Sequence, residues 1–197
     1  MSNQAWHDDP KRLAFLMSRY KFVAKMFTGM GRVLEVGCAD AFATRIVVQS
    51  AKRVLATDFD PVFIEDVAAR MDPQWPFDCK VHDILSGPVD GAFDGAFALD
   101  VIEHILPEHE DAFVGNMAKS LTPHGTMIVG SPSLQSQSYA SALSKEGHVN
   151  CKDGMDLKRL AEKYFHNVFL FGMNDEVLHT GFHPMAQYLF VLCTGPK

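Results

Sequence analysis

The chain has 197 residues, of which 24 are acidic and 18 are basic, so its formal net charge is −6 at neutral pH. Hydrophobic residues make up 47% of the chain and charged residues 21%, which is typical of a globular domain and excludes a disordered or fibrous protein. No apolar run approaches the roughly 18 residues that a membrane helix needs, and the acidic balance argues against nucleic acid held by bulk charge. We therefore expect one domain over residues 1–197, with no membrane contact.

The cysteines and the first residues indicate the compartment. The segment from Met1 to Pro10 is polar and acidic, unlike a secretory signal. The chain has four widely spaced cysteines and no Cys-x-x-Cys pair, which argues against a zinc knuckle or a disulfide framework: Cys38, Cys79, Cys151 and Cys193. We expect reduced thiols in a cytoplasmic protein.

Short apolar runs alternate with amphipathic stretches along the chain. The patterns predict strands over residues 32–37, 53–58, 79–83, 92–100, 126–130, 167–171 and 187–193, and helices over 12–27, 41–50, 61–70, 108–121 and 155–164. This alternation predicts a mainly parallel sheet between two helix layers, closed by an antiparallel pair because only a loop separates the last two strands. Ligands of such sheets bind at the carboxyl ends of the strands.

The residues that follow the first three strands predict an adenosine site. Gly37 comes directly after the first strand, where it permits a sharp turn and the close approach of a ligand. Asp58 ends the second strand, placed to accept hydrogen bonds from ribose hydroxyls. Asp83 ends the third strand and is placed to accept from an adenine amino group, while Ile84 is expected to pack on the ring.

The first loop also indicates which adenosine compound binds. Its sequence, Glu35-Val-Gly-Cys-Ala-Asp-Ala41, lacks the later glycines of a dinucleotide fingerprint and the Gly-Lys of a phosphate-binding loop. Asp40 in the turn would repel a phosphate but accommodate a cation. S-adenosylmethionine carries a sulfonium and an amino group, so this loop favours it over NAD.

With these motifs in order, the chain resembles the class I S-adenosylmethionine-dependent methyltransferases. The resemblance covers most of residues 30–132 and rests on Val33-Leu-Glu-Val-Gly-Cys38, Asp58, the His82-Asp83 pair and Phe93 to His104. It implies a Rossmann-like α/β fold whose seven-stranded, mainly parallel sheet has an antiparallel last strand and helices on both faces.

The resemblance also assigns the cofactor contacts. Glu35 belongs to the glycine motif, and Gly37 with the turn that follows would face the methionine moiety. The remaining contacts that the resemblance implies are Asp58 with the ribose, Phe59 stacked on the base, Asp83 and Ile84 with the adenine, Leu99 and Asp100 around the methionine end, and Ala39 and Asp40 in the turn. Ala39 and Ala41 stand where the family usually has glycine.

A transfer site is expected beyond the fourth strand. An acceptor hydroxyl needs a base, for which a histidine with a pKa near 6.5 is suited, and His104 and His148 are the candidates. Alternatively, Asp100, Glu103 and His104 converge on a divalent cation if this segment turns helically, with His148 as a distal ligand. Small-RNA 2′-O-methyltransferases and ubiquinone-pathway O-methyltransferases use a similar Glu-x-x-Glu-His segment around a metal. The third possibility is that Glu103 and His104 only form hydrogen bonds around the turn.

Two segments are expected to cover the site. Residues 131–153 are polar and too long for a plain connector, which predicts a substrate loop or lid. Residues 1–30 contain an amphipathic helix, which we expect to pack on the domain as a helical cover. By resemblance to the family, Arg19 or Tyr20 would reach the carboxylate of the cofactor.

These patterns predict an S-adenosylmethionine-dependent methyltransferase that modifies a polar small molecule, most plausibly a hydroxyl of a sugar, glycan precursor or related metabolite. The alternatives are an RNA ribose 2′-O-methyltransferase that uses a divalent metal, and an S-adenosylmethionine-binding module without catalysis. An NAD-dependent dehydrogenase is the remaining alternative for the cofactor. The sequence gives no indication of the oligomeric state.

Overall fold

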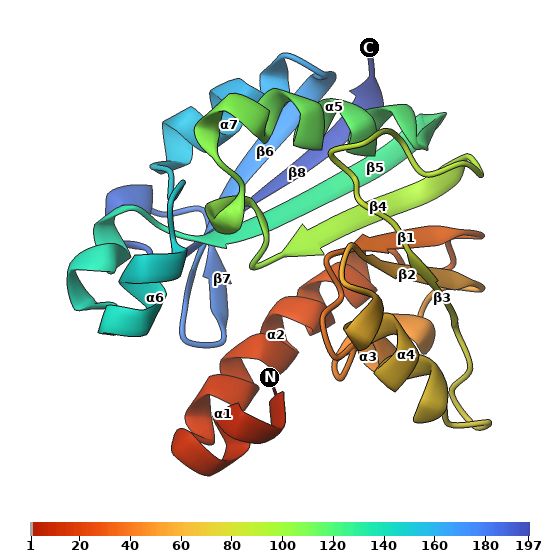
Figure 1. Ribbon diagram of the computed structural model, residues 1–197. Helices are drawn as coiled ribbons and strands as arrows, with labels where there is room; N and C mark the ends of the chain where they lie inside the picture. Colours follow the sequence, from red (N-terminus) through yellow and green to blue (C-terminus); the bar gives the residue numbers. More distant parts are fainter. Residues whose placement is uncertain (1) are drawn as a thin grey trace.

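The computed structural model describes residues 2–197, and its centre is one eight-stranded sheet (Figure 1). The strands are β1 (Val33–Val36), β2 (Val54–Asp58), β3 (Asp78–Val81), β4 (Phe93–Leu99), β5 (Leu121–Pro132), β6 (Phe165–Asn174), β7 (Val177–His179) and β8 (Tyr188–Pro196). Their order across the sheet is β3-β2-β1-β4-β5-β8-β6-β7. The first five strands pair in parallel, whereas β8 runs antiparallel to both β5 and β6. The expected Rossmann-like, mainly parallel sheet is confirmed.

The sheet has one strand more than the seven that the sequence predicts. The additional strand, β7, pairs antiparallel with β6 over three positions and forms a hairpin at the edge of the sheet. Asp175 has a left-handed φ of 51° in the turn between them. A three-residue strand is too short to give an alternating pattern, which is why the sequence does not reveal it.

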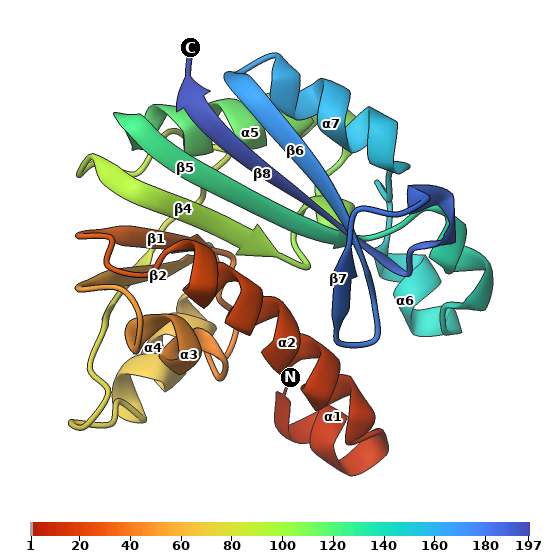
Figure 2. The same cartoon turned by 180° about the vertical axis from the view of Figure 1, so that it is seen from behind.

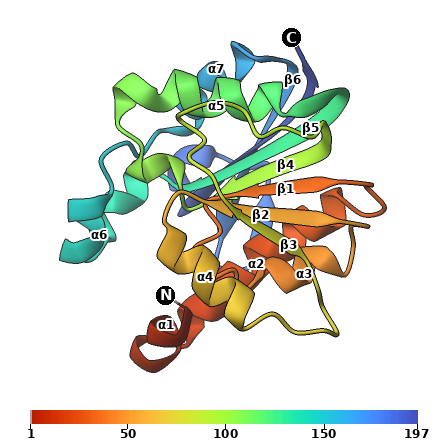
Figure 3. The ribbon, with the colours of Figure 1, turned by 45° about the vertical axis from the view of Figure 1, so that its right-hand side comes forward.

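Helices cover both faces of the sheet, as Figures 2 and 3 show from behind and from the side. They are α1 (Ser2–Asp8), α2 (Lys11–Met26), α3 (Thr44–Val48), α4 (Pro61–Ala69), α5 (Glu110–Lys119), α6 (Ala142–Gly147) and α7 (Gly154–Glu162), together with the short 3₁₀ helices η1 (Ile102–His104), η2 (Pro107–His109), η3 (Gln135–Tyr139) and η4 (His183–Met185). The layer of α2, α3 and α4 buries one face, and α5 with α7 buries the other. Within residues 2–197, none of the helices has the length and apolar character to cross a bilayer.

The helix boundaries follow local signals. Pro61 occupies the first position of α4, and the Asp60 carboxylate accepts a hydrogen bond of 2.9 Å from the Val62 amide, as expected for an N-cap. Helix α5 ends at Lys119, before the predicted boundary, because β5 already begins at Leu121. The register between β4 and β5 shifts at this point. Phe93 pairs with Leu121 and Gly95 pairs with Thr126, so β5 has extra residues between two positions that are nearly adjacent in β4.

Helix α2 has two roles along its length. Near its carboxyl end Val23, Ala24 and Phe27 are buried against the sheet, as an amphipathic helix requires. Near its amino end Leu13 and Leu16 line an open cleft instead. The N-terminal segment therefore both packs on the domain and walls the cleft.

Candidate active site

The cleft lies at the carboxyl ends of the parallel strands, between α1–α2 on one side and the η3–α6 segment on the other (Figure 1). Its volume is about 1120 Å³, above the roughly 300–1,000 Å³ of common small-molecule pockets, so it has room for two ligands side by side. The loops after β1, β4 and β5 contribute its floor, and η4 contributes part of its rim. The predicted position of the site is thus a real cavity.

The loop after β1 forms the part of the floor nearest α1. Gly37 has a φ of 75°, and a Cβ atom on it would lie 2.5 Å from Cγ2 of Val101, so glycine is required here on both counts. Ala39 and Ala41 have left-handed φ values of 46° and 47°. Both alanines therefore occupy a conformation that favours glycine, which agrees with the glycines that the resemblance leads us to expect at these positions.

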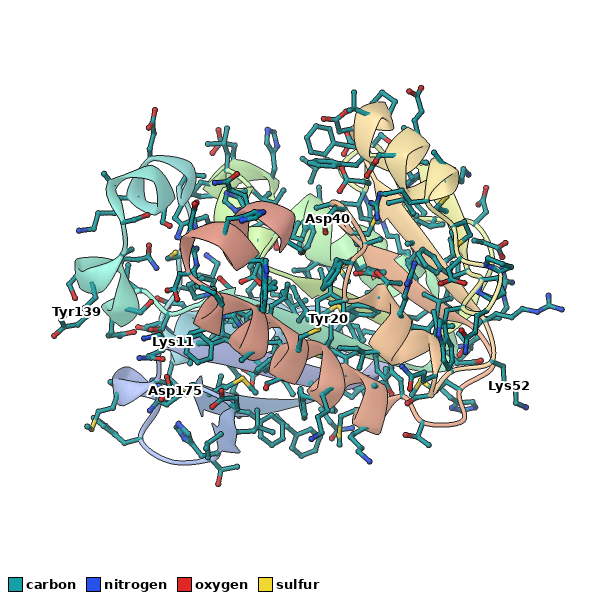
Figure 4. All side chains as sticks on the ribbon, turned by 90° about the horizontal axis from the view of Figure 1, so that it is seen from below. Lys11, Tyr20, Asp40, Lys52, Tyr139 and Asp175 are labelled. Carbon is teal, nitrogen blue, oxygen red and sulfur yellow. The ribbon has the colours of Figure 1, made fainter. Side chains whose placement is uncertain are left out.

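Two aspartates hold this loop in place. Asp58 is buried, and its carboxylate accepts hydrogen bonds from the amides of Ala39 at 2.9 Å and Asp60 at 3.0 Å. Asp40 lines the cleft and accepts a hydrogen bond of 2.7 Å from the Ser2 amide, which joins the loop to α1 (Figure 4). Each carboxylate oxygen has more than one acceptor site, so these contacts leave lone pairs on Asp58 for a ligand.

Glu35 lies beneath the loop and does not line the cleft. Tyr20 Oη and Thr44 Oγ1 each donate a hydrogen bond of 2.7 Å to its two carboxylate oxygens. Burial raises the pKa of Glu35 to about 7, although these two hydrogen bonds act in the opposite direction. Glu35 therefore joins β1 to α2 and α3, which corrects the expectation that it contacts the cofactor.

The three residues predicted to contact the adenine, Phe59, Asp83 and Ile84, do not line this cleft. Phe59 is 73% exposed at the end of β2, and Asp83 is exposed after β3, with its carboxylate accepting from the Leu85 amide at 2.9 Å. Neither Phe59 nor Asp83 is among the residues that line the cleft. Ile84 is 6% exposed and belongs to the core beneath α5, where Asn116 Nδ2 donates to its carbonyl at 2.8 Å, so its side chain does not reach an adenine at the surface.

Asp100 lies in the cleft but has an internal partner. Nη1 of Arg19 lies 3.0 Å and 2.9 Å from its two carboxylate oxygens, and the Arg19 guanidinium lies 3.8 Å from the centre of the Tyr188 ring. Leu99 lines the same wall. In the structure Arg19 is thus paired with Asp100, whereas the resemblance implies that Arg19 or Tyr20 reaches the carboxylate of the cofactor.

Glu103, His104 and His148 form a cluster beside this pair. One carboxylate oxygen and one nitrogen from each imidazole lie within 4.8 Å of one another. Glu103 is 1% exposed, and within residues 2–197 neither of its carboxylate oxygens has a hydrogen-bond partner at ordinary distance and angle, although the Ser131 hydroxyl lies near enough to favour the carboxylate form. Burial, followed by the nearby charge of Asp100, raises the pKa of Glu103 well above its ordinary value. A carboxyl group buried in this way needs a cation or a proton to compensate it.

The two imidazoles are oriented by acceptors. Nδ1 of His104 lies 2.8 Å from the Gly147 carbonyl, and Nδ1 of His148 lies 2.8 Å from Oε1 of Gln137. Because these oxygens only accept, each Nδ1 carries the proton and each Nε2 keeps its lone pair. Burial lowers the pKa of His148, which favours the neutral ring. One carboxylate with two neutral imidazoles is a donor set that suits a divalent transition metal.

The structure brings His148, and not Asp100, to Glu103 and His104. Asp100 does not join the cluster because the Arg19 guanidinium already neutralises its carboxylate. The segment from Ile102 to His104 forms the turn η1, which directs Glu103 inward and leaves His104 exposed at the cleft. The residues therefore fit a metal ion, with a ligand set that differs from the predicted one at one position.

Comparison with known proteins agrees with this architecture. Residues 34–127 match the family model of a methyltransferase domain. A probable S-adenosylmethionine-dependent methyltransferase of Mycolicibacterium smegmatis is 29% identical over 101 residues, which cover 51% of this chain. Residues 34–127 of this chain are therefore similar to a methyltransferase domain. The matched region covers 37% of the mycobacterial protein, so the chain spans well under half the length of that relative.

Solved methyltransferases share the fold across nearly the whole chain. N-methyltransferase NodS from Bradyrhizobium japonicum, in complex with S-adenosyl-L-homocysteine, superposes with a TM-score of 0.68 at 18% identity, covering 98% of this chain and 91% of its own. A putative methyltransferase in complex with the Haloferax volcanii Trm112 activator gives 0.75 at 12% identity, covering 98% and 97%. The methyltransferase domain of a bacterial CtHen1 gives 0.73 at 16% identity, covering 91% and 98%. At these identities the likeness extends to the fold alone.

The polar segment after β5 is more ordered than the sequence indicates. It contains η3 and α6, and Ser141 caps α6 by accepting from the Ser144 amide at 3.2 Å. Ser133 fixes its base, since its hydroxyl donates to the Ala186 carbonyl at 2.6 Å. Several polar side chains of this segment line the cleft, among them Gln135, Ser136, Gln137 and Ser138. Tyr139 projects outward and is 92% exposed (Figure 4).

Proposed function

We propose that the protein transfers the methyl group of S-adenosylmethionine to a hydroxyl of a polar small molecule, such as a sugar, glycan precursor or related metabolite, at a divalent-metal site formed by Glu103, His104 and His148. The observation that carries this proposal is the buried Glu103 carboxylate, which has no hydrogen-bond partner and lies beside two imidazoles. The match of residues 34–127 to a methyltransferase-domain model supports the methyl donor.

The cofactor belongs to the half of the cleft nearest α1. Gly37, Ala39 and Asp40 would face its methionine moiety, with Leu99 on the adjoining wall. Asp58, Phe59 and Asp83 at the ends of β2 and β3 would hold its adenosine. When bound, S-adenosylmethionine supplies an electrophilic methyl group on a positively charged sulfur.

The acceptor belongs to the other half. A metal ion held by Glu103 and the two imidazoles would lower the pKa of a coordinated hydroxyl. Gln135 and Ser138 line this half and offer hydrogen bonds to a hydroxyl-rich molecule. Helices α1 and α2 close the opposite side and limit the access of water, so that nucleophile and methyl group can be held in line.

Metal binding and general-base catalysis both require the lone pair on Nε2 of His104 or His148, so one nitrogen cannot serve both at once. The lone pair of an imidazole that binds a cation cannot take up a proton. The unpartnered Glu103 favours metal ligation, because a histidine base alone leaves this carboxyl group without a role. Dependence of the activity on a divalent metal separates the two hypotheses.

The proposal is tested with purified protein, S-adenosylmethionine and a panel of sugars, glycan precursors and RNA oligonucleotides with a free terminal ribose. We expect O-methylated small molecules by mass spectrometry, and loss of product after treatment with EDTA. Product that is only N-methylated contradicts the oxygen acceptor. Methylation of the oligonucleotides alone identifies RNA as the acceptor instead, although the net charge of −6 does not favour RNA binding. Binding of cofactor without any turnover supports a non-catalytic module.

The segment roles and the compartment belong to the same proposal. We infer one methyltransferase domain over residues 1–197, with residues 1–30 as a helical cover and residues 131–153 as a substrate lid, since both segments contribute to the cleft. We also propose a cytoplasmic location, because Cys38, Cys79, Cys151 and Cys193 are all free thiols.

A further inference from the structure

The lid supplies the hydrogen-bond acceptors of both histidines in the cluster. Gly147, at the end of α6, accepts from His104, and Gln137, in η3, accepts from His148. His148 itself directly follows α6. The position of the lid and the orientation of the two rings are therefore coupled.

The Gln137 amide is oriented from its other side. Its Nε2 donates to the Ser133 carbonyl at 3.4 Å and to Ser136 Oγ at 3.3 Å, which leaves Oε1 facing His148. Ser133 is completely buried and is held by Ala186 and Gln187 of the domain. A continuous chain of hydrogen bonds thus runs from the rigid base of the lid through Gln137 to His148.

We propose that Gln137 is a positioning residue that keeps the His148 proton on Nδ1, so that the Nε2 lone pair is available to a divalent metal, and that the metal in turn stabilises the closed lid. This inference rests on the proposed metal site and adds a residue that the sequence patterns did not single out. The partner of a ligating histidine typically contributes about 10–100-fold to metal affinity. Because coupling between two equilibria is reciprocal, a lid that favours metal binding must itself be favoured by the metal.

The first measurement needs no metal. In the full-length protein labelled with ¹⁵N-histidine, the nitrogen chemical shifts of His148 report which nitrogen carries the proton. We expect the Nδ1–H form in the wild type and in Gln137→Glu, which keeps an acceptor oxygen. Gln137→Ala should give a mixture of the two tautomers. An unchanged Nδ1–H form in Gln137→Ala contradicts the positioning role.

The second measurement uses Co²⁺ alone, without cofactor or acceptor. Calorimetry and the visible absorption of bound Co²⁺ should show binding that is about 10–100-fold weaker in Gln137→Ala than in the wild type. Gln137→Glu should retain most of the affinity. Tyr139→Ala is the matched control, because Tyr139 lies in the same lid, is 92% exposed and is not a hydrogen-bond partner of either imidazole, and it should leave the affinity unchanged.

Hydrogen exchange tests the lid itself. Co²⁺ should slow exchange at the amides of Lys145 and His148, which close the turns of α6. This protection should be smaller in Gln137→Ala. Equal Co²⁺ affinity in the wild type and Gln137→Ala overturns the inference while the metal site stands. A wild type that binds no Co²⁺, and thus behaves like His104→Ala, overturns the metal site and this inference together.

Discussion

The carboxylates in the two halves of the cleft differ in whether the protein supplies them with hydrogen-bond donors. In the half nearest α1 and in the strands and loop beneath it, the acidic side chains already have donors from the protein: Asp40 accepts from Ser2, Asp58 from backbone amides, and Glu35 from Tyr20 and Thr44. In the half beneath the lid, Glu103 is just as deeply buried but accepts no hydrogen bond. The carboxylates of the first group stabilise the loop and strands around the site. The Glu103 carboxylate has no such structural partner, which is the arrangement expected of a metal ligand.

Asp100 marks the boundary between the halves. Its carboxylate belongs to the satisfied group because Arg19 contacts both of its oxygens, although it lies only three residues before Glu103. The comparison shows that an acidic residue near a catalytic motif is informative only when its partners are known. Substitutions of Glu103 and Glu35 test this distinction, and substitutions of Gly37 and Ala39 test the loop beside it, with expected effects that decrease in this order.

Replacement of Glu103 should have the largest effect on activity. We expect Glu103→Gln to lower kcat/KM by about 10²–10⁴-fold, the range that positioned catalytic groups contribute, and to abolish Co²⁺ binding. Its thermal stability should equal or exceed that of the wild type, because an unpartnered buried carboxyl group is removed.

The matched control is Glu110→Gln. Glu110 lies nearby but is paired with Lys152 at 2.6 Å and with Asn150 at 3.1 Å. This variant should lose stability and keep its metal affinity. Unchanged activity of Glu103→Gln in the presence of EDTA would contradict the difference between the two halves.

Glu35 makes stability depend on pH. Its pKa is about 7 in the folded protein against an ordinary value of 4.5, so the folded state binds the proton more tightly than the unfolded state. The stability that this group contributes is fully present below about pH 4.5 and is lost as the pH rises through 7. The fall amounts to about 3 kcal/mol, and Glu35→Gln should lack it. Urea unfolding at several pH values between 4 and 8 measures the free energy of unfolding of the wild type and of Glu35→Gln. If the two proteins show the same dependence on pH, Glu35 is not the group responsible.

Gly37→Ala should damage both halves at once. The added methyl group requires a strained φ and collides with Val101, which lies between Asp100 and the Glu103 turn. We expect a loss of about 1–3 kcal/mol of stability and weaker binding of S-adenosylhomocysteine, both measurable by urea unfolding and calorimetry. Adding Val101→Ala should recover part of the loss, since it removes the collision but not the strain. No recovery would mean that backbone strain alone accounts for the effect.

Ala39→Gly should have the smallest effect and the opposite sign. Release from a left-handed conformation is worth about 1–2 kcal/mol, and the flexibility of glycine in the unfolded chain offsets about 0.5–1 kcal/mol of it. A stabilisation of at most about 1.5 kcal/mol is therefore expected. Ala43→Gly is the control, because Ala43 has an ordinary φ of −89° and should be destabilised. Chemical denaturation of both variants decides the sign.

Local patterns were sufficient for the fold and for the loops at the strand ends. Gly37, Asp58 and the Asp60–Pro61 helix start are all signals that act within a few residues. The position of Glu35 in the glycine motif predicts a cofactor contact but does not determine where its side chain points, and in the fold it points to Tyr20 and Thr44. Ile84 was misplaced for a similar reason, since only the packing of α5 over it explains its burial.

The cluster of Glu103, His104 and His148, the proposed metal site, depends on contacts between residues that are distant in the chain. Glu103 and His104 are neighbours, so the motif identified them together. The substitution of His148 for Asp100 depends on Arg19, 81 positions before Asp100, and on the folded lid. Gln137 gave no signal because a glutamine in a polar loop is common, and its role follows only from the acceptor that it offers to a ring.

The place of β8 in the sheet has a consequence for synthesis of the chain. Although it is the last strand in sequence, β8 is inserted between β5 and β6. The region that carries the glycine loop and the Glu103 turn therefore leaves the ribosome with the hydrogen-bonding edge of β5 exposed. Until residues 188–196 emerge, that edge has no partner strand and is open to pairing with other chains, which is a general route to aggregation.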